Sequence, residues 1–465
     1  MMENIEIKQD QYLTKALLGP CISIVLAALG ISAAAVVLPE ISGDFKGSAM
    51  DPNLVVSTYV LAVTALILPM GRAGDVYGKR NVLIAGLVIF TLGVCAASLA
   101  TNLQVLVASR LVQGAGAAAM MAMPMAQVRE IVPKGQTGRW MGVMGTMSAI
   151  GTASGPALAG IIASSFDWRA VFWLQIPLAM FALSMCLAHL AKPKSNRAQN
   201  TIDFKGAIAL IIFLASLVLF LSDIKHGLDL STGLLMGLSA FAFICFIAFE
   251  KRSNPPLIPM QMLSTKNLRI SLLSNVCVSL IMMGILIVGP YYLTLGLGLT
   301  TAQMGFIMSI GPIIAALSGV PAGRLTEKVG AEPATFIGLL GMITATAAMS
   351  LLPYAIGLVG FMIAFMILTP SYQVFLAGLN TSVMQDTSDK DHGVTSGLVN
   401  LSRNFGFVLG ASLFGIVFWS IVDLNIGLND VAENISMAMA GTFFLACCVV
   451  CSALMLLFIS RRLQE

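Results

Sequence analysis

Charge is what this chain has least of. Only 10% of its 465 residues are Asp, Glu, Lys or Arg, while 57% are hydrophobic. The mean hydropathy is +0.90. A soluble domain of this length needs far more polar material to cover its surface, so the composition excludes a water-soluble fold. We expect an all-α membrane protein.

The residues that build metal sites and catalytic sites are few or scattered. The three histidines stand far apart, and the eight cysteines all fall inside apolar stretches, where they behave as small apolar side chains. Neither disulfides nor a metal site is indicated. The chain also has no Gly-x-x-x-x-Gly-Lys-Ser/Thr loop and no convergent nucleophile and base. We therefore predict no enzyme activity, no catalytic residues, no cofactor and no ATP-driven transport.

Carboxylates are missing from the middle of the apolar stretches. The 22 Asp and Glu lie in tails, loops or near the ends of these stretches, and the ones nearest membrane depth are Glu40, Asp44, Asp75, Glu130, Asp223 and Glu433. Buried acids usually pair with lipophilic cations and carry protons. The interior charges are instead Arg110 and Arg403, which favour an anion or an acidic group on a larger substrate. Proton transfer through Asp75, Glu40, Asp223 or the substrate itself stays open.

Long apolar runs are what the chain has in abundance. Fourteen stretches are long enough to cross about 30 Å of hydrocarbon. They run at about 16–39, 53–72, 81–100, 104–126, 138–162, 169–191, 206–223, 232–249, 268–294, 302–323, 334–353, 356–381, 393–422 and 435–460. The first stretch is too long for a cleaved signal, so we expect a permanent span.

The distribution of lysine and arginine predicts the orientation. With both termini in the cytoplasm, these residues gather in the tails and even-numbered loops, and only Lys46, Arg169 and Lys225 fall outside. The net charge of +4 therefore reflects topology and contact with anionic membrane lipid, and no nucleic acid is expected as a partner.

One short loop occurs twice. Gly71-Arg-Ala-Gly-Asp-Val-Tyr-Gly78 and Gly323-Arg-Leu-Thr-Glu-Lys-Val-Gly330 share the pattern Gly-Arg-x-x-acid-x-x-Gly between apolar stretches. Internal repeats of this kind are common in transporters. The loops follow the second and tenth spans, so two spans are inserted between the halves. We predict a six-helix bundle in 1–191, linkers and two inserted helices in 192–266, and a second bundle in 267–465.

Four ordered motifs carry a resemblance to the major facilitator superfamily, and within it to the fourteen-span drug:proton antiporter family. The first is the loop with Gly71, Asp75, Gly78, Lys79 and Arg80, and the second is a fourth-helix motif with Arg110, Gln113 and Gly114. The third resembles a fifth-helix antiporter motif with Gly151, Gly155, Pro156 and Gly160, and the fourth is the following segment Asp167-Trp-Arg-Ala-Val-Phe-Trp173.

The resemblance implies two six-helix bundles around a central cavity, with the extra helix pair outside. It implies a gating role for Asp75, although the loop can also serve only to set topology. The glycines and Pro156 either seal the antiporter against proton leak or simply allow close helix packing. Arg110 either faces substrate or organises helices through backbone carbonyls. The family's first-helix Asp-x-Thr-x-x-Asn pattern is replaced by Gly30, Ser32 and Ala35.

Polar residues in the second half are candidates for a substrate cavity. Arg403 is flanked by Asn400 and Asn404 on one helical turn, and Tyr372 and Gln373 are polar within another apolar stretch. The tyrosine and glutamine are equally compatible with a position at the membrane interface.

The leading functional prediction is a monomeric secondary exporter of small amphipathic compounds, driven by proton antiport and alternating access, in a bacterial cytoplasmic membrane. Its partners are a small-molecule substrate, protons and membrane lipid. The alternative is a dedicated exporter of an anionic metabolite such as a siderophore. A receptor or scaffold without transport is disfavoured, because the loop and its repeat are both kept.

Overall fold

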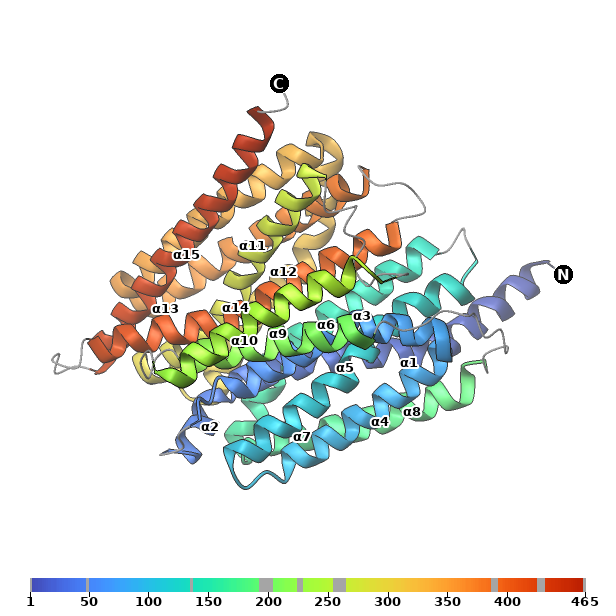
Figure 1. Ribbon diagram of the computed structural model, residues 1–465, viewed down its shortest axis with the longest axis horizontal. Helices are drawn as coiled ribbons and strands as arrows, with labels where there is room; N and C mark the ends of the chain where they lie inside the picture. The colour runs from blue at the N-terminus through green and yellow to red at the C-terminus, as the bar shows by residue number, and fades with distance from the viewer. Residues whose placement is uncertain are drawn as a thin grey trace. The chain divides into compact units, whose positions relative to one another are not determined.

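The computed structural model describes residues 2–46, 50–133, 137–191, 204–223, 229–253, 265–385, 392–424 and 431–462, and the regular elements in this part of the chain are helical. Figure 1 shows them in chain order. They are α1 (Met2–Val36), α2 (Leu38–Asp44), α3 (Leu54–Tyr77), α4 (Lys79–Ser98), α5 (Leu103–Ile131), α6 (Thr137–Ser165), α7 (Ala170–Trp173), α8 (Gln175–His189), α9 (Phe204–Asp223), α10 (Leu230–Glu250), α11 (Lys266–Tyr291) with the π-helical turn η4 (Tyr292–Gly296), α12 (Thr301–Val329), α13 (Ala331–Gln385), α14 (His392–Leu424) and α15 (Val431–Arg462).

Within the described residues, twelve helices are long and apolar enough to cross a membrane. The all-α membrane fold expected from composition is therefore present. The twelve include α13, which has 55 residues, whereas the apolar part of α9, Lys205–Leu221, is shorter than a usual span. The count of fourteen spans and the side on which the termini lie stay predictions.

The chain forms two compact units. Unit 1 contains Met1–Ala34, Asp44–Ser216 and Gly237–Leu257, and unit 2 contains Ala35–Gly43, Leu217–Met236 and Ile258–Glu465. The predicted division at 191 and 266 stays a prediction.

Unit 1 is assembled by close approaches at glycines. On the paired helices α4 and α5, a Cβ on Gly86 would collide with Ala119, and a Cβ on Gly93 would collide with the backbone of Gln113. The residue number of the contact rises from 86 to 93 on α4 while it falls from 119 to 113 on α5, so the two helices are antiparallel. Small residues thus let the two backbones touch, which is how helices associate in a bilayer.

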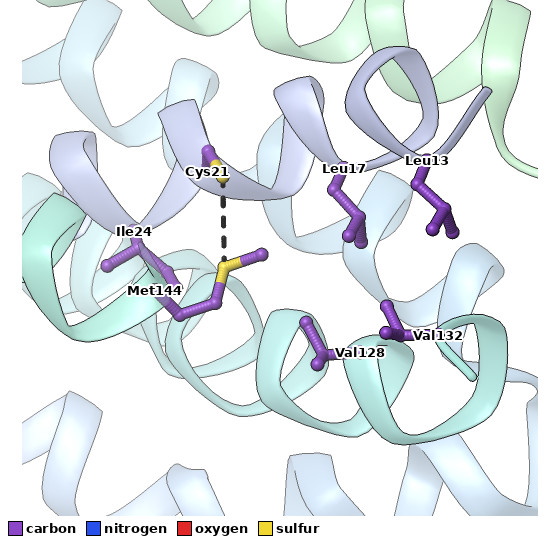
Figure 2. Close-up of a cluster of buried hydrophobic side chains, with 7 residues drawn as sticks. All are labelled: Leu13, Leu17, Cys21, Ile24, Val128, Val132 and Met144. Atoms are coloured by element: carbon purple, nitrogen blue, oxygen red, sulfur yellow. Dashed lines mark hydrogen bonds between the residues drawn. The ribbon is translucent and has the colours of Figure 1, made fainter. Parts of the chain in front are cut away.

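The start of α1 packs on α5 and α6 through an apolar cluster. Its buried members are Leu13, Leu17, Cys21, Ile24, Val128, Val132 and Met144 (Figure 2). Cys21 Sγ lies 3.9 Å from Met144 Sδ. The buried members of this cluster, which join three helices, are sulfur-containing and branched aliphatic side chains.

In unit 2, α13 is a hairpin of two helical arms. Ile356 and Gly357 have non-helical backbone angles, and Gly357 has a φ of 58°. A Cβ on Gly338 would meet Phe375, and a Cβ on Gly341 would meet Ser371, so the arms 331–355 and 358–385 run antiparallel. Glycine relieves the steric cost of a positive φ at the break. The sequence predicted two separate stretches here, at 334–353 and 356–381.

Candidate functional site

The first copy of the repeated loop joins α3 to α4 at a single residue, Gly78. Gly78 has a φ of 90° and a ψ of 131°, a conformation that favours glycine. Its N–H donates to the Gly74 carbonyl at 3.0 Å, and its carbonyl accepts from Val82 N–H at 3.2 Å. The chain therefore leaves one helix and enters the next with almost no loop between them.

The second copy has the same geometry in unit 2. Gly330 joins α12 to α13 with a φ of 93° and a ψ of 162°. Its N–H donates to the Thr326 carbonyl at 2.9 Å, and its carbonyl accepts from Ala334 N–H at 3.2 Å. The final glycine of the motif is thus needed in both copies for the same positive φ.

The charged residues of the first copy reach different partners. Lys79 Nζ pairs with Glu130 at the end of α5 at 3.0 Å, and Arg80 donates to the Leu187 carbonyl on α8 at 3.1 Å. Asp75 is exposed and has no hydrogen-bond or ion-pair partner in the described part of the chain. The loop thus ties α4 to α5 and α8, and the gating role of Asp75 stays a prediction.

Arg110 is fully buried inside unit 1. Its Nε donates to the Val55 carbonyl at 2.9 Å, and one terminal nitrogen donates to the Gly30 carbonyl at 2.7 Å. The other donates to Gln113, whose amide donates to Gln175 at 3.0 Å. The guanidinium lies 4.1 Å from the centre of the Tyr59 ring. Carbonyls and a π face thus surround this cation, the geometry of a residue that organises helices.

The fourth-helix motif also packs closely against α3. A Cβ on Gly114 would collide with the Tyr59 carbonyl and Ala62, and Tyr59 in turn donates its hydroxyl to the Ala27 carbonyl at 2.8 Å. Gly30, which takes the place of the family's usual acid, supplies a backbone carbonyl to Arg110. The first-helix position therefore takes part in this network through its backbone.

The fifth-helix motif lies on α6, and its glycines face α1. A Cβ on Gly151 would collide with the Val25 carbonyl, and a Cβ on Gly155 would collide with Ser32. Pro156 and Gly160 are buried. The contacting residue numbers rise together on the two helices, from Gly151 to Gly155 on α6 and from Val25 to Ser32 on α1. The helices α1 and α6 are therefore parallel, with their backbones in contact.

The segment that follows α6 is held by an acid that the sequence analysis gave no role. Asp44 accepts a hydrogen bond from Trp168 Nε1 at 2.8 Å and pairs with Arg169 at 3.4 Å. Arg169 also donates to the Ala100 carbonyl at 3.0 Å and covers the Trp168 ring at 4.2 Å. This cluster fixes the start of α7 to the α4–α5 connection.

The candidate cavity residues of unit 2 are only partly brought together. Arg403 donates to Asn400 at 2.8 Å, and Tyr372 lies close enough to Arg403 to interact with its charge. Asn404 is buried on the same turn of α14. Gln373 instead donates to the Ala315 carbonyl on α12 at 3.2 Å.

Two residues of α11 join this group and were missed by sequence reasoning. Asn275 is fully buried and donates to the Val399 carbonyl at 2.9 Å and to Ser402 Oγ at 2.8 Å. Ser279, also fully buried, lies beside Tyr372. The available signal was an amide inside an apolar stretch, because buried polar groups in a bilayer are costly and are often functional. The resulting polar cluster is defined as Asn275, Ser279, Tyr372, Asn400, Arg403 and Asn404.

The two remaining acidic candidates of unit 2 form hydrogen bonds with residues outside this cluster. Glu40 on α2 accepts a hydrogen bond from Thr301 at the start of α12. Asp223 at the end of α9 accepts from Thr232 at 3.1 Å and from Ser231 at 3.4 Å. Within the described residues, no group of three or more His, Cys, Asp or Glu could hold a metal ion.

Comparison with known proteins places this geometry in a family. Residues 21–411 match the Major Facilitator Superfamily. The chain is 27% identical over 399 residues to the riboflavin transporter RibZ of Clostridioides difficile, covering 86% of each chain. It is 24% identical over 423 residues to the multidrug transporter protein MdtP of Bacillus subtilis, covering 87% of this chain and 75% of that one.

Solved structures agree on the fold. A bacterial homolog of the human lysosomal transporter Spinster, in an inward-facing and occupied conformation, superposes with a TM-score of 0.70 at 13% identity, over 97% of each chain. The family consists of transporters and not of enzymes. The chain therefore belongs to the Major Facilitator Superfamily and is a multi-pass membrane transporter of small molecules.

Proposed function

We propose that this protein is a secondary exporter of small amphipathic compounds that exchanges its substrate for protons. The observation that carries the proposal is the contact of Gly151 and Gly155 on α6 with the backbone of α1, next to the buried Pro156. The motif resembles that of antiporters, and the contact leaves no space for a side chain between the helices. A dry, tightly packed helix pair of this kind is suited to block proton leak during the cycle.

The names of two relatives fit a role in the transport of small organic compounds. The relatives are the multidrug transporter MdtP and the riboflavin transporter RibZ. The two names describe a riboflavin transporter and a multidrug transporter, and both organisms are bacteria. The bacterial cytoplasmic membrane is accordingly the proposed location, and the monomer is the proposed functional form.

Fourteen spans are the proposed topology, with both termini in the cytoplasm. A continuous 55-residue helix would be about 80 Å long, far more than the ~30 Å of a hydrocarbon core, so a break at Ile356 and Gly357 supports two crossings by α13. The 20-residue α9 supports a further span paired with α10. These two additions to the twelve candidate helices account for the proposed number.

The repeated loop supports alternating access as the mechanism. A helix pair joined by a single glycine moves as one body, so the α3–α4 and α12–α13 joints can transmit a rocking motion without bending a loop. Asp75 is proposed as the gate, and Asp75, Glu40 and Asp223 remain the candidate proton carriers. The proposed domains are the bundles at 1–191 and 267–465, with the inserted helices at 192–266.

Proton movement in inside-out vesicles tests this function. Vesicles that contain the protein are energised to an acidic lumen, and the pH gradient is followed with an acridine dye while rhodamine 123, a cation, or fluorescein, an anion, is added. Substrate-dependent collapse of the gradient is expected. A gradient that no amphipathic compound disturbs, in vesicles with verified protein content, contradicts proton-coupled export.

A further inference from the structure

We infer that the polar cluster of unit 2 binds the oxyanion of an amphipathic substrate, with Arg403 as the charged contact. This inference rests on the proposed export function and adds to it the chemical class of the substrate. It is based on groups within α11 and α14 whose hydrogen-bonding capacity is left unused.

Four buried polar atoms of the cluster have no hydrogen-bond partner in the described part of the chain. They are Asn275 Oδ1, Ser279 Oγ, Arg403 Nε and Asn404 Nδ2. Asn275 is fully buried, and Asn404 is 3% exposed. Unused donors and acceptors inside a membrane protein carry a high desolvation cost, because no lipid can replace water as their partner. Because several such atoms lie in one cluster, we infer that a bound ligand or water supplies their missing hydrogen bonds.

The amide of Asn275 is fixed in one orientation. Its nitrogen must donate, because one of its two partners is the Val399 carbonyl at 2.9 Å, which can only accept. Its second hydrogen reaches Ser402 Oγ at 2.8 Å. The Oδ1 atom is therefore the free end, and it offers an acceptor to a ligand hydroxyl or N–H.

The charge of the cluster is positive, and within the described residues no acidic side chain forms an ion pair with it. Arg403 is half-buried within the candidate span Gly397–Leu424, and its described contact is with the neutral Asn400. Among the described residues, the ion pairs of the chain lie elsewhere, at Lys79 and Arg169. A cation in a low-dielectric site without an acidic partner attracts an anion.

The donors fit an oxyanion better than a neutral carbonyl. Arg403 Nε and Asn404 Nδ2 are one residue apart on α14 and are both free to donate. A guanidinium presents its N–H groups in a planar fork that matches the two oxygens of a carboxylate or the oxygens of a phosphate. The inferred ligand is therefore an amphipathic organic anion that also carries a hydroxyl or N–H for Asn275.

Equilibrium binding to the purified protein in lipid nanodiscs tests the inference without any ion gradient. Fluorescein and rhodamine 123 share a xanthene skeleton and differ in charge, so their fluorescence anisotropy separates charge recognition from hydrophobic binding. The variants are Arg403→Gln, Arg403→Lys and Asn404→Leu. Arg269→Gln is the matched control, since it removes an arginine from an exposed position on α11.

We expect saturable fluorescein binding by the wild type and by Arg269→Gln. Arg403→Gln should weaken it about tenfold or more, the size of one charge-assisted hydrogen bond, and leave rhodamine 123 binding unchanged. Arg403→Lys should bind fluorescein with intermediate affinity, because it keeps the charge and loses the fork; this variant also covers the case in which Arg403→Gln does not fold. Asn404→Leu should weaken fluorescein by a few-fold.

The inference is overturned if Arg403→Gln and Arg269→Gln weaken fluorescein binding equally, or if Arg403→Gln loses the binding of both dyes to the same extent. It is also overturned if the wild type binds rhodamine 123 and not fluorescein. Absence of saturable fluorescein binding to a folded wild-type protein also overturns it. Arg403-dependent binding in nanodiscs together with no substrate-driven proton movement in vesicles would leave this site standing and remove the proposed antiport.

Discussion

The same parallel helix pair occurs once in each unit, and the two copies differ in chemistry. In unit 1, Gly151 on α6 contacts the Val25 carbonyl and Ala28 on α1; in unit 2, Gly406 on α14 contacts the Val276 carbonyl and Ser279 on α11. Gly155 and Gly410 repeat the contact one turn later, against Ser32 and Met283. The duplicated chain has therefore kept the backbone packing of this pair in both halves.

The side chains beside these glycines have diverged. The α1·α6 pair ends in the apolar cluster of Figure 2, where Cys21 and Ile24 pack near Met144. The corresponding part of the α11·α14 pair holds Asn275 bonded to Ser402, with Arg403 next along the helix. Packing constrains the glycines in both units. We propose that the first pair serves as a tightly packed seal and that the surface beside the second pair binds substrate.

The largest expected effect comes from filling the close contacts. Gly151→Val and Gly406→Val both place a branched side chain against a backbone carbonyl, so each should reduce transport to background and lower thermal stability. The cost of overpacking is about 1–3 kcal/mol or more. Transport in vesicles and thermal unfolding of purified protein are the measurements.

Gly145→Val on the same helix α6 is the control, because a Cβ built there meets nothing within 4 Å beyond the adjoining backbone of its own helix. It should keep nearly full transport. If Gly151→Val transports as well as Gly145→Val, the close packing of α1 on α6 has no role in the cycle.

The next largest effect separates the two repeated loops. Asp75→Asn should express normally and lose most transport, because the proposed gate depends on that charge. Glu327→Gln changes the corresponding acid of the second copy, which lacks the Lys79 and Arg80 pair, and should retain most transport. Initial rates at matched protein levels decide the matter. Normal transport by Asp75→Asn removes this residue from the mechanism.

One polar and one apolar substitution test whether the side chains beside the α1·α6 and α11·α14 pairs have different roles. Ile24→Asn places an amide in the apolar cluster of unit 1 and should destabilise the protein by about 1–3 kcal/mol. Asn275→Leu removes the two hydrogen bonds of the Asn275 amide, but Ser402 still donates to the Val399 carbonyl. The Asn275→Leu protein should therefore lose less than about 1 kcal/mol of stability. The order of the two unfolding temperatures is the readout. The reverse order would mean that Asn275 is a structural residue.

The smallest effect is expected at the exposed ion pair of the first loop. Lys79→Ala makes this position like Ala331 in the second copy and breaks the contact with Glu130, whose side chain is 61% exposed. Exposed pairs contribute up to about 1 kcal/mol, so transport should fall by less than about threefold. A complete loss of transport would show that Lys79 itself belongs to the gate.

Sequence patterns predicted the elements more fully than the site. The repeated loop predicted two equivalent helix joints, and both final glycines have the positive φ that explains them. Apolar runs predicted the helices and the break in α13 near Ile356, because length and hydropathy are local properties. The family resemblance, extended by the match over residues 21–411, supplied the transporter class.

The polar cluster could be predicted only in part, because its contacts join helices far apart in sequence. Arg403, Asn400 and Asn404 share one turn and were visible as a group. Asn275 and Ser279 lie more than a hundred residues earlier, in a strongly apolar helix, and become part of the cluster only when α11 packs against α14. Gln373 donates to the Ala315 carbonyl on α12, and its place in a substrate cavity stays a prediction.

The most direct test of the central claim is proton-driven accumulation of fluorescein in inside-out vesicles, compared between the wild type and Arg403→Gln. We expect the wild type to accumulate fluorescein only when the lumen is acidic and to lose this accumulation when a protonophore is added, and we expect Arg403→Gln to accumulate far less. Accumulation that does not depend on the proton gradient would rule out proton-driven export, and equal accumulation by both proteins would rule out Arg403 as the anion contact.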